Sequence, residues 1–167
     1  MTEHVKVNGA NVVIEGPDET FLLELGSYGR WMLPGGGVER AELPVHAGMD
    51  ETLEETGLIV AQEDLQLIAL LVQKVVRGGQ TIPISGIVAL YRCDKYDGKL
   101  PTEPNDEVVE WKFVTFERAL ELYQQGKLLR GYMRMLVIYD NIRRGLLKPV
   151  YEAILADQVP VRPQLFI

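Results

Sequence analysis

The chain has 167 residues, 47% of them hydrophobic and 25% charged, which predicts one soluble globular domain with a substantial core. Its net charge of -7 argues against general nucleic-acid binding and against binding to anionic membranes, since both need basic patches. The single cysteine, Cys93, excludes an intramolecular disulfide and a zinc-binding cysteine cluster, and we interpret it as a core thiol. Because no signal peptide or membrane-length apolar run is visible, we expect a cytoplasmic enzyme or binding domain without membrane partners.

Two strands are predicted in the first part of the chain from their β-branched and apolar residues. The first covers residues 5–14 and the second residues 20–25, with the turn formers Gly-Pro-Asp-Glu at 16–19 between them. Because so short a turn joins them, we expect the two strands to pair as a hairpin. A loop over residues 26–30 then leads through Trp31 to Pro34 and three consecutive glycines.

A helix is predicted over residues 44–56, directly after the glycines. Pro44 suits its first turn, and Gly57 supplies a left-handed cap at its end. At 100° per residue, one arc of this helix carries four acids, namely Asp50, Glu51, Glu54 and Glu55. The opposite face carries the apolar residues that we expect to pack into a core, which are Val45, Met49 and Leu53.

The four acids are badly placed for an isolated helix. Carboxylates near a helix C-terminus oppose the macrodipole, and like charges four residues apart repel each other. A positive group should therefore lie over this face, and a hard divalent cation such as Mg²⁺ or Mn²⁺ suits oxygen ligands. The alternative is a solvated acidic face beside a flexible loop. The glycine run immediately before the helix favours a site.

The second half of the chain predicts more strands and then helices. Residues 65–76 and 81–93 form a hairpin about two glycines, residues 107–114 form a further strand, and Thr115 caps a helix over residues 116–125. Apolar residues at helical spacing predict a last helix over residues 128–144. We expect residues 1–167 to form a single domain, with residues 148–167 an extension or arm that packs on the core or on a second subunit, so that a homodimer is possible.

The stretch from Gly36 to Leu58 carries a recognisable spacing. Gly36 is followed after five residues by Glu42, and after seven more by the sequence DETLEETGL. This resembles the Nudix box, which reads glycine, five residues, glutamate, seven residues, and then Arg-Glu-aliphatic-any-Glu-Glu-any-Gly-aliphatic. Every glycine and glutamate of the box falls in register. Asp50 replaces the arginine, and Thr52 replaces the first aliphatic residue, whose apolar contact we expect Leu53 to recover.

The resemblance implies an α+β fold, an α/β/α sandwich with a mixed central sheet between helices. It also implies metal-dependent hydrolysis, with Mg²⁺ or Mn²⁺, of a phosphoanhydride bond in a nucleoside diphosphate linked to another moiety. The partner would then be a small nucleotide. Because aspartate cannot replace the orienting arginine of the box, Asp50 leaves an alternative: a Nudix-like nucleotide-binding or sensor module with weak or no turnover.

The resemblance also assigns roles within the box. Glu51 and Glu54 would be catalytic, and the metal ligands would be the carbonyl of Gly36 and the carboxylates of Glu51, Glu54 and Glu55. Glu51 would act either as a ligand or as the general base. Glu42 would be a further contact to the metal, and Gly37 would let the loop backbone approach the substrate.

Outside the box, the family often supplies one more carboxylate from a later loop or strand, for which the candidates are Glu107 and Glu110. Arg30 is a candidate for binding phosphate. Tyr28 or Trp31 could stack on a base, although a core role is the better interpretation for Trp31. We read His4 and His46 as structural.

Overall fold

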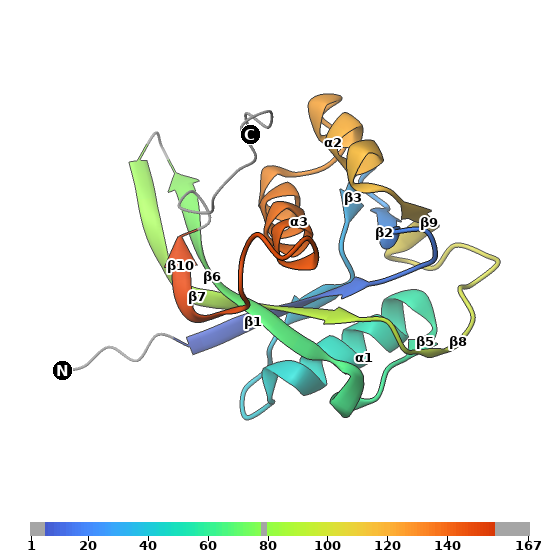
Figure 1. The fold of residues 1–167 in the computed structure, drawn as a ribbon, viewed down its shortest axis with the longest axis horizontal. Coiled ribbons are helices and arrows are strands. Elements are labelled where there is room, and N and C mark those ends of the chain that lie inside the picture. Colours follow the sequence, from blue (N-terminus) through green and yellow to red (C-terminus); the bar gives the residue numbers. More distant parts are fainter. Residues whose placement is uncertain (1–5, 78–79, 156–167) are drawn as a thin grey trace.

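Strand β1 (Lys6–Ile14) lies at the centre of the molecule, in a computed structural model that describes residues 6–77 and 80–155. It belongs to a five-stranded sheet in the order β10-β6-β7-β1-β4 (Figure 1). The other members are β4 (Gly35–Gly37), β6 (Gln66–Arg77), β7 (Gln80–Cys93) and β10 (Val150–Leu155). β1 runs parallel to β7 and antiparallel to β4, while β6 and β7 form the predicted antiparallel hairpin, so the sheet is mixed.

A second sheet of three strands has the order β3-β2-β9, made of β3 (Trp31–Met32), β2 (Phe21–Gly26) and β9 (Val108–Val114). The two strands β5 (Leu58–Ile59) and β8 (Asp97–Gly98) form a small third sheet. The predicted hairpin of β1 with β2 is wrong, because β1 pairs with β7 and β4 whereas β2 pairs with β3 and β9. The turn at residues 16–19 is present, but it carries the chain from one sheet to another through a single bridge, Glu15 to Phe21.

Helix α1 (Pro44–Thr56) covers one face of the large sheet, and α2 (Phe116–Gln124) and α3 (Arg130–Arg143) lie on the other side (Figure 1). A short 3-10 helix, η1 (Gln62–Asp64), follows β5. The caps are those predicted: the hydroxyl of Thr115 accepts from the N–H of Arg118 at 3.2 Å, and Gly57 has a φ of 70°. In the described part of the chain, no helix is long and apolar enough to cross a membrane.

The alternation of side chains along β1 fills two cores. Val12 and Ile14 pack under α1 with Ala47, whereas Val13 packs under α3 with Leu136. Both faces of β1 are therefore buried from Ala10 to Ile14, while its first four residues are exposed or partly exposed. This arrangement of helices, mixed sheet and helices is the predicted α+β sandwich.

The beginning of the predicted C-terminal extension adds a strand to the domain. β10 pairs in parallel with β6 at the edge of the large sheet. Residues 156–167, which complete that extension, lie outside the described part of the chain, as do the N-terminal residues 1–5 with His4.

Candidate functional site

Helix α1 packs so closely on β1 that a side chain at Gly48 would make a tight contact. A Cβ on Gly48 would lie 3.3 Å from the Cγ2 of Val12. The side chains turned toward this contact are Ala47 and Thr52, which are 1% and 0% exposed. Leu53 is 48% exposed, so the prediction that it packs into the core in place of Thr52 is wrong. Val45 and Met49, the other two residues predicted to face the core, are partly buried against it, while the fully buried arc of α1 also includes one of the acids.

The four acids of α1 therefore differ in their surroundings. Glu55 is 7% exposed, Glu51 is partly buried, and both Glu54 and Asp50 are exposed. Glu51 and Glu55 face β4 and β2, while Asp50 lies on the solvent side. Asp50 occupies the arginine position of the box, so its carboxylate is an outer member of this acidic face.

The glycine strand β4 makes room for two of these carboxylates. The N–H of Gly35 donates to Oε2 of Glu55 at 2.9 Å. A Cβ on Gly36 would collide with the carboxylate of Glu51, and a Cβ on Gly35 would collide with the carbonyl of Ala10. Gly35 also has a φ of 148°, which side chains rarely adopt. Gly35 must therefore be a glycine, whereas a side chain at Gly36 would displace the carboxylate of Glu51.

A fifth carboxylate, Glu24 on β2, joins the cluster, and the sequence analysis missed it. Its side chain is 0% exposed, and no N–H or O–H of the described residues donates to either of its oxygens. Burial, then the charge of Glu55 and a hydrogen bond shared with it, raise the pKa of Glu24 to about 9. The signal in the sequence is a single acid inside the otherwise apolar strand FLLEL, which strand alternation alone would assign to the core.

Of the two later carboxylates proposed, the structure brings Glu107 to the cluster. The charge of Glu107 raises the pKa of Glu24, Glu51 and Glu55, so it acts on all three. Glu110, by contrast, lies on β9 opposite Leu25 and pairs with Lys112 at 2.8 Å with both side chains about half exposed. Glu110 is therefore engaged elsewhere.

Two candidates lie at the edge of the cluster. Oε2 of Glu42 accepts from the N–H of Glu39 at 2.8 Å, and its charge contributes to raising the pKa of Glu51. Gly37 is exposed at the end of β4, where it pairs with Gly9.

The aromatic and basic candidates lie in or beside the loop between β2 and β3. Arg30 is exposed, and Tyr28 is 97% exposed. Trp31 is 7% exposed beneath the ammonium group of Lys112, 5.7 Å from its ring centroid, so its core role is confirmed. His46 lies near the 3-10 helix, where its ring contacts the Gln62 side chain at 3.1 Å, in keeping with a structural role.

The electrostatics of the cluster are uniformly negative. Burial raises the pKa of Glu51, and the charges of Glu54, Glu107, Glu42 and Asp50 raise it further. Burial also raises the pKa of Glu55, against the lowering effect of its hydrogen bonds with Gly35 and Glu24. The pKa values of Glu24, Glu51 and Glu55 are thus all raised, which is expected of carboxylates that lie together away from water.

A divalent cation fits this donor set. The donors are carboxylate oxygens, which hard cations prefer, one buried carboxylate is unpartnered, and a glycine cradle keeps side chains away. In the conformation described, no three His, Cys, Asp or Glu side chains of the described residues enclose a common point. The carboxylates of Glu55 and Glu42 are held by backbone N–H groups instead.

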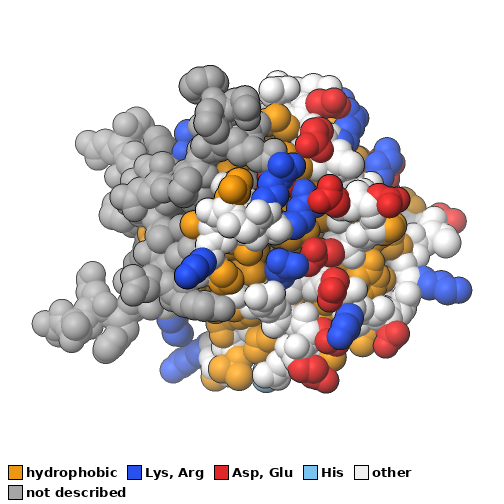
Figure 2. Space-filling view, in the orientation of Figure 1, with side chains coloured by type: hydrophobic (Ala, Val, Ile, Leu, Met, Phe, Trp, Pro, Cys, Tyr) orange, Lys and Arg blue, Asp and Glu red, His pale blue; other side chains and the backbone are white. Residues whose placement is uncertain are grey.

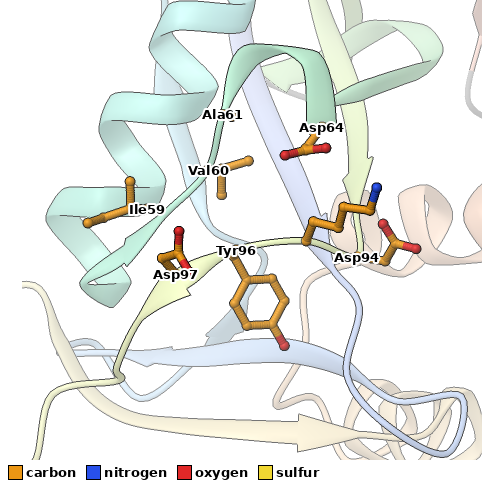
Figure 3. Close-up of a pocket in the computed structure, with 8 residues that line it drawn as sticks. Ile59, Val60, Ala61, Asp64, Asp94, Tyr96 and Asp97 are labelled. Atoms are coloured by element: carbon orange, nitrogen blue, oxygen red, sulfur yellow. The ribbon is translucent and has the colours of Figure 1, made fainter.

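A pocket of about 410 Å³ lies elsewhere, between β5 and the segment that leads into β8 (Figure 3). Its polar lining comes from Asp64, Asp94, Lys95, Tyr96 and Asp97, and none of the acids of α1 takes part. The described part of the face in Figure 2 carries acidic side chains beside lysines and arginines, with no uniformly basic patch. Neither feature changes the assignment of the site to α1, β4 and β2.

The comparison with protein-family models matches residues 5–135 to the NUDIX domain. The chain belongs to the Nudix family. This membership confirms the resemblance to the Nudix family. The chain is also 25% identical over 101 residues to the uncharacterized Nudix hydrolase YvcI of Bacillus subtilis (strain 168). That alignment covers 60% of this chain and 62% of YvcI, so the chain spans less than two thirds of that relative.

Solved structures of Nudix proteins share the fold. The E. coli ORF135 protein matches with a TM-score of 0.64 and 18% identity, over 87% of this chain and 96% of that protein. A C. elegans Ap4A hydrolase, solved as a binary complex, matches with a TM-score of 0.58 and 21% identity, over 85% and 99%. Identities this low support the Nudix sandwich and leave the substrate open.

Proposed function

We propose that this Nudix domain hydrolyses a phosphoanhydride bond in a nucleoside diphosphate linked to another moiety, with Mg²⁺ or Mn²⁺ as cofactor. The observation that carries the proposal is the gathering of Glu51, Glu55, Glu107 and Glu24 from three elements against the glycine strand β4. No N–H or O–H of the described residues donates to Glu24, and the charges that raise its pKa are all negative. The C. elegans relative of similar fold is an Ap4A hydrolase by name, which agrees with a substrate of this class.

The carboxylates of Glu51, Glu54 and Glu55, with the carbonyl of Gly36, would hold the cation. When bound, the cation neutralises phosphate oxygens and lowers the pKa of a water molecule. Glu51 would act either as such a ligand or as the general base that takes a proton from the attacking water, a role that its partial burial and raised pKa suit. Glu42 and Glu107, at the edge of the cluster, would orient the groups that hold the cation. Arg30, exposed at the end of the loop directly before β3, would bind substrate phosphate, and Gly37 would let the backbone approach it.

The test is a hydrolysis assay on a panel of nucleoside diphosphate derivatives, with Mg²⁺ or Mn²⁺ varied and products identified. We expect metal-dependent turnover of at least one compound by the wild type and its loss in Glu54→Gln. Glu54 is exposed, so this change should leave the fold intact. The matched control is Glu121→Gln on α2, which removes one exposed carboxylate outside the cluster. Equal turnover in wild type and Glu54→Gln would contradict the proposal.

The second candidate is a nucleotide-binding or sensor module with weak or no turnover, and Asp50 supports it. Asp50 adds a negative charge that raises the pKa of Glu51, where the box would place an orienting arginine. Tight nucleotide binding without product would favour this candidate. Asp50→Arg should raise turnover if the aspartate only weakens the site, and should lower it if Asp50 has acquired a role of its own.

The location, binding partners and oligomeric state of the protein are also proposals. We expect a cytoplasmic protein that acts on a small nucleotide and binds neither membranes nor nucleic acid in general. A homodimer through the C-terminal part of the chain remains open to a measurement of mass in solution.

A further inference from the structure

Glu24 is an anomaly in the sheet that carries it. On β2 it shares a face with Leu22, which packs in the core beneath α1, and its strand neighbours in register are Met32 and Trp111. An apolar residue would fill this place without electrostatic penalty. Glu24 is 0% exposed, and neither carboxylate oxygen receives a hydrogen bond from the described residues. A buried carboxyl group in this state needs a ligand, a proton or a functional reason.

The neighbours of Glu24 make the anomaly sharper. The charges that act on it most strongly are those of Glu55, Glu107 and Glu51, and all are negative. Tyr132 of α3 lies close enough that both Glu55 and Glu24 raise the pKa of its phenol, after the larger effect of burial. The carboxyl group is thus buried near the acids of α1 and the phenol of Tyr132 on α3.

Two arrangements can stabilise Glu24 beside Glu55. In the first, Glu24 carries a proton and donates it to Glu55, which is a structural role. In the second, a cation lies between the two carboxylates. Glu55 already receives the N–H of Gly35 on Oε2, which fixes that side chain. Glu24 receives no such bond, although a backbone or side-chain donor would be the ordinary way to fix an acid that serves structure alone.

We propose that Glu24 is an additional cation ligand, on the deep side of the Nudix cluster, and that it holds a divalent ion together with Glu55. It lies outside the box and reaches the site from the second sheet. This inference rests on the metal dependence proposed above. It predicts that cation binding in this chain depends on a strand residue that no box motif contains.

The test is calorimetric titration of Mn²⁺ into wild type, Glu24→Gln and the control Glu121→Gln. Glutamine keeps the volume of the side chain, and its amide can still donate to Glu55, so a purely structural role survives the change. If Glu24 is a ligand, the affinity of Glu24→Gln for Mn²⁺ falls by about 10–100-fold or more. The control should bind as the wild type does. Unchanged affinity in Glu24→Gln would overturn the proposal.

A second variant and a second readout keep the result clear if Glu24→Gln folds poorly. Glu24→Asp keeps the charge but shortens the reach, so its affinity should also fall, and its melting temperature without metal should stay near that of the wild type. Unchanged affinity in Glu24→Asp together with a native melting temperature would count against a ligand. The ligand role of Glu24 is contradicted, and the proposed hydrolase is not, if the wild type hydrolyses nucleotides while Glu24→Gln binds Mn²⁺ with unchanged affinity. The proposed hydrolysis is contradicted, and the ligand role of Glu24 is supported, if Mn²⁺ binding by the wild type depends on Glu24 but no nucleotide is hydrolysed.

Discussion

Two glutamates lie on either side of the turn between β1 and β2, and their surroundings are opposite. Glu15 accepts from Nε of Arg92 at 2.9 Å and from the phenol of Tyr139 at 3.0 Å, and its side chain is 16% exposed. Glu24 is fully buried and receives no donor from the described residues. The first acid ties α3 and β7 to the end of β1. The second lies among other acids, and we propose that it is a cation ligand.

The difference teaches how to separate structural from functional acids in this fold. An acid with cationic and phenolic partners stabilises the native state, and its loss leaves those partners unsatisfied. An acid surrounded by like charges destabilises the empty protein and becomes favourable only with a proton or a cation. The two classes should therefore respond to mutation in opposite directions.

The largest expected effect is on turnover. Glu55→Gln should lower kcat on the best substrate by about 100-fold or more, since it removes a ligand at the centre of the cluster. The fold should persist, because glutamine can still accept from the N–H of Gly35. Steady-state kinetics with Mg²⁺ or Mn²⁺ measure the change, and circular dichroism checks the fold. Retained turnover would place the chemistry away from α1.

The next effect falls on the structural member of the pair. Glu15→Gln should lower the free energy of unfolding by about 2 kcal/mol, because Arg92 loses its charged partner while Tyr139 keeps an acceptor. Urea unfolding measures it. Turnover of the folded variant should equal that of wild type. An unchanged or higher free energy of unfolding in Glu15→Gln would contradict the structural role that distinguishes Glu15 from Glu24.

Glu24 should make the stability of the protein depend on pH. The folded pKa of Glu24 is raised above the usual glutamate value of 4.5, so the folded state holds a proton that the unfolded chain releases. The contribution of Glu24 to the free energy of unfolding of the metal-free protein should then be most favourable below about pH 4.5. It should fall as the pH rises toward about 9. We expect the melting temperature to drop by more than about 3 °C between pH 6 and pH 9, which is about 1 kcal/mol for a chain of this size. In Glu24→Gln the drop should be smaller; an identical drop would mean that Glu24 is not the titrating group.

The smallest effect concerns the hydroxyl beside the cluster. Thr52 is 0% exposed, and its Oγ1 has no hydrogen-bond partner among the described residues. Thr52→Val should therefore raise the free energy of unfolding by about 1 kcal/mol. The matched control is Thr56→Val, because the Thr56 hydroxyl donates to the carbonyl of Thr52 at 2.5 Å and accepts from the N–H of Leu58 at 3.1 Å. That change should destabilise, and two changes of the same sign would contradict the assignment of partners.

Local rules predicted the elements that depend on local chemistry. The bounds of α1 came from Pro44 and Gly57, since a proline in the first turn and a left-handed glycine cap act over a few residues. Thr115 likewise marked the start of α2. The partner of β1 is a long-range property, however, and the short turn after Ile14 wrongly suggested a hairpin. Parallel pairing with β7 brings together strands that lie far apart in the sequence.

The site was predicted as far as the box motif reaches. The box gave Glu51, Glu54 and Glu55, but the helical wheel alone gave no sign that Glu55 points inward while Leu53 points out. Glu107 and Glu110 could not be separated, because strand direction and the pairing of Glu110 with Lys112 exist only in the folded chain. Glu24 was missed because it is a single acid in an apolar strand. Whether such an acid is buried or exposed depends on which helix packs over the strand, and the sequence does not show that.

The most direct test of the account is the melting temperature of the wild type at pH 8 as Mg²⁺ or Mn²⁺ is added. A cation that binds only the folded cluster stabilises it by mass action, and it takes the place of the proton that the raised pKa of Glu24 keeps on that carboxyl group. We expect a rise that saturates by millimolar metal and that shrinks in Glu55→Gln but not in Glu121→Gln. No rise at millimolar metal, or an equal rise in Glu55→Gln, would contradict the claim that these acids form a cation site.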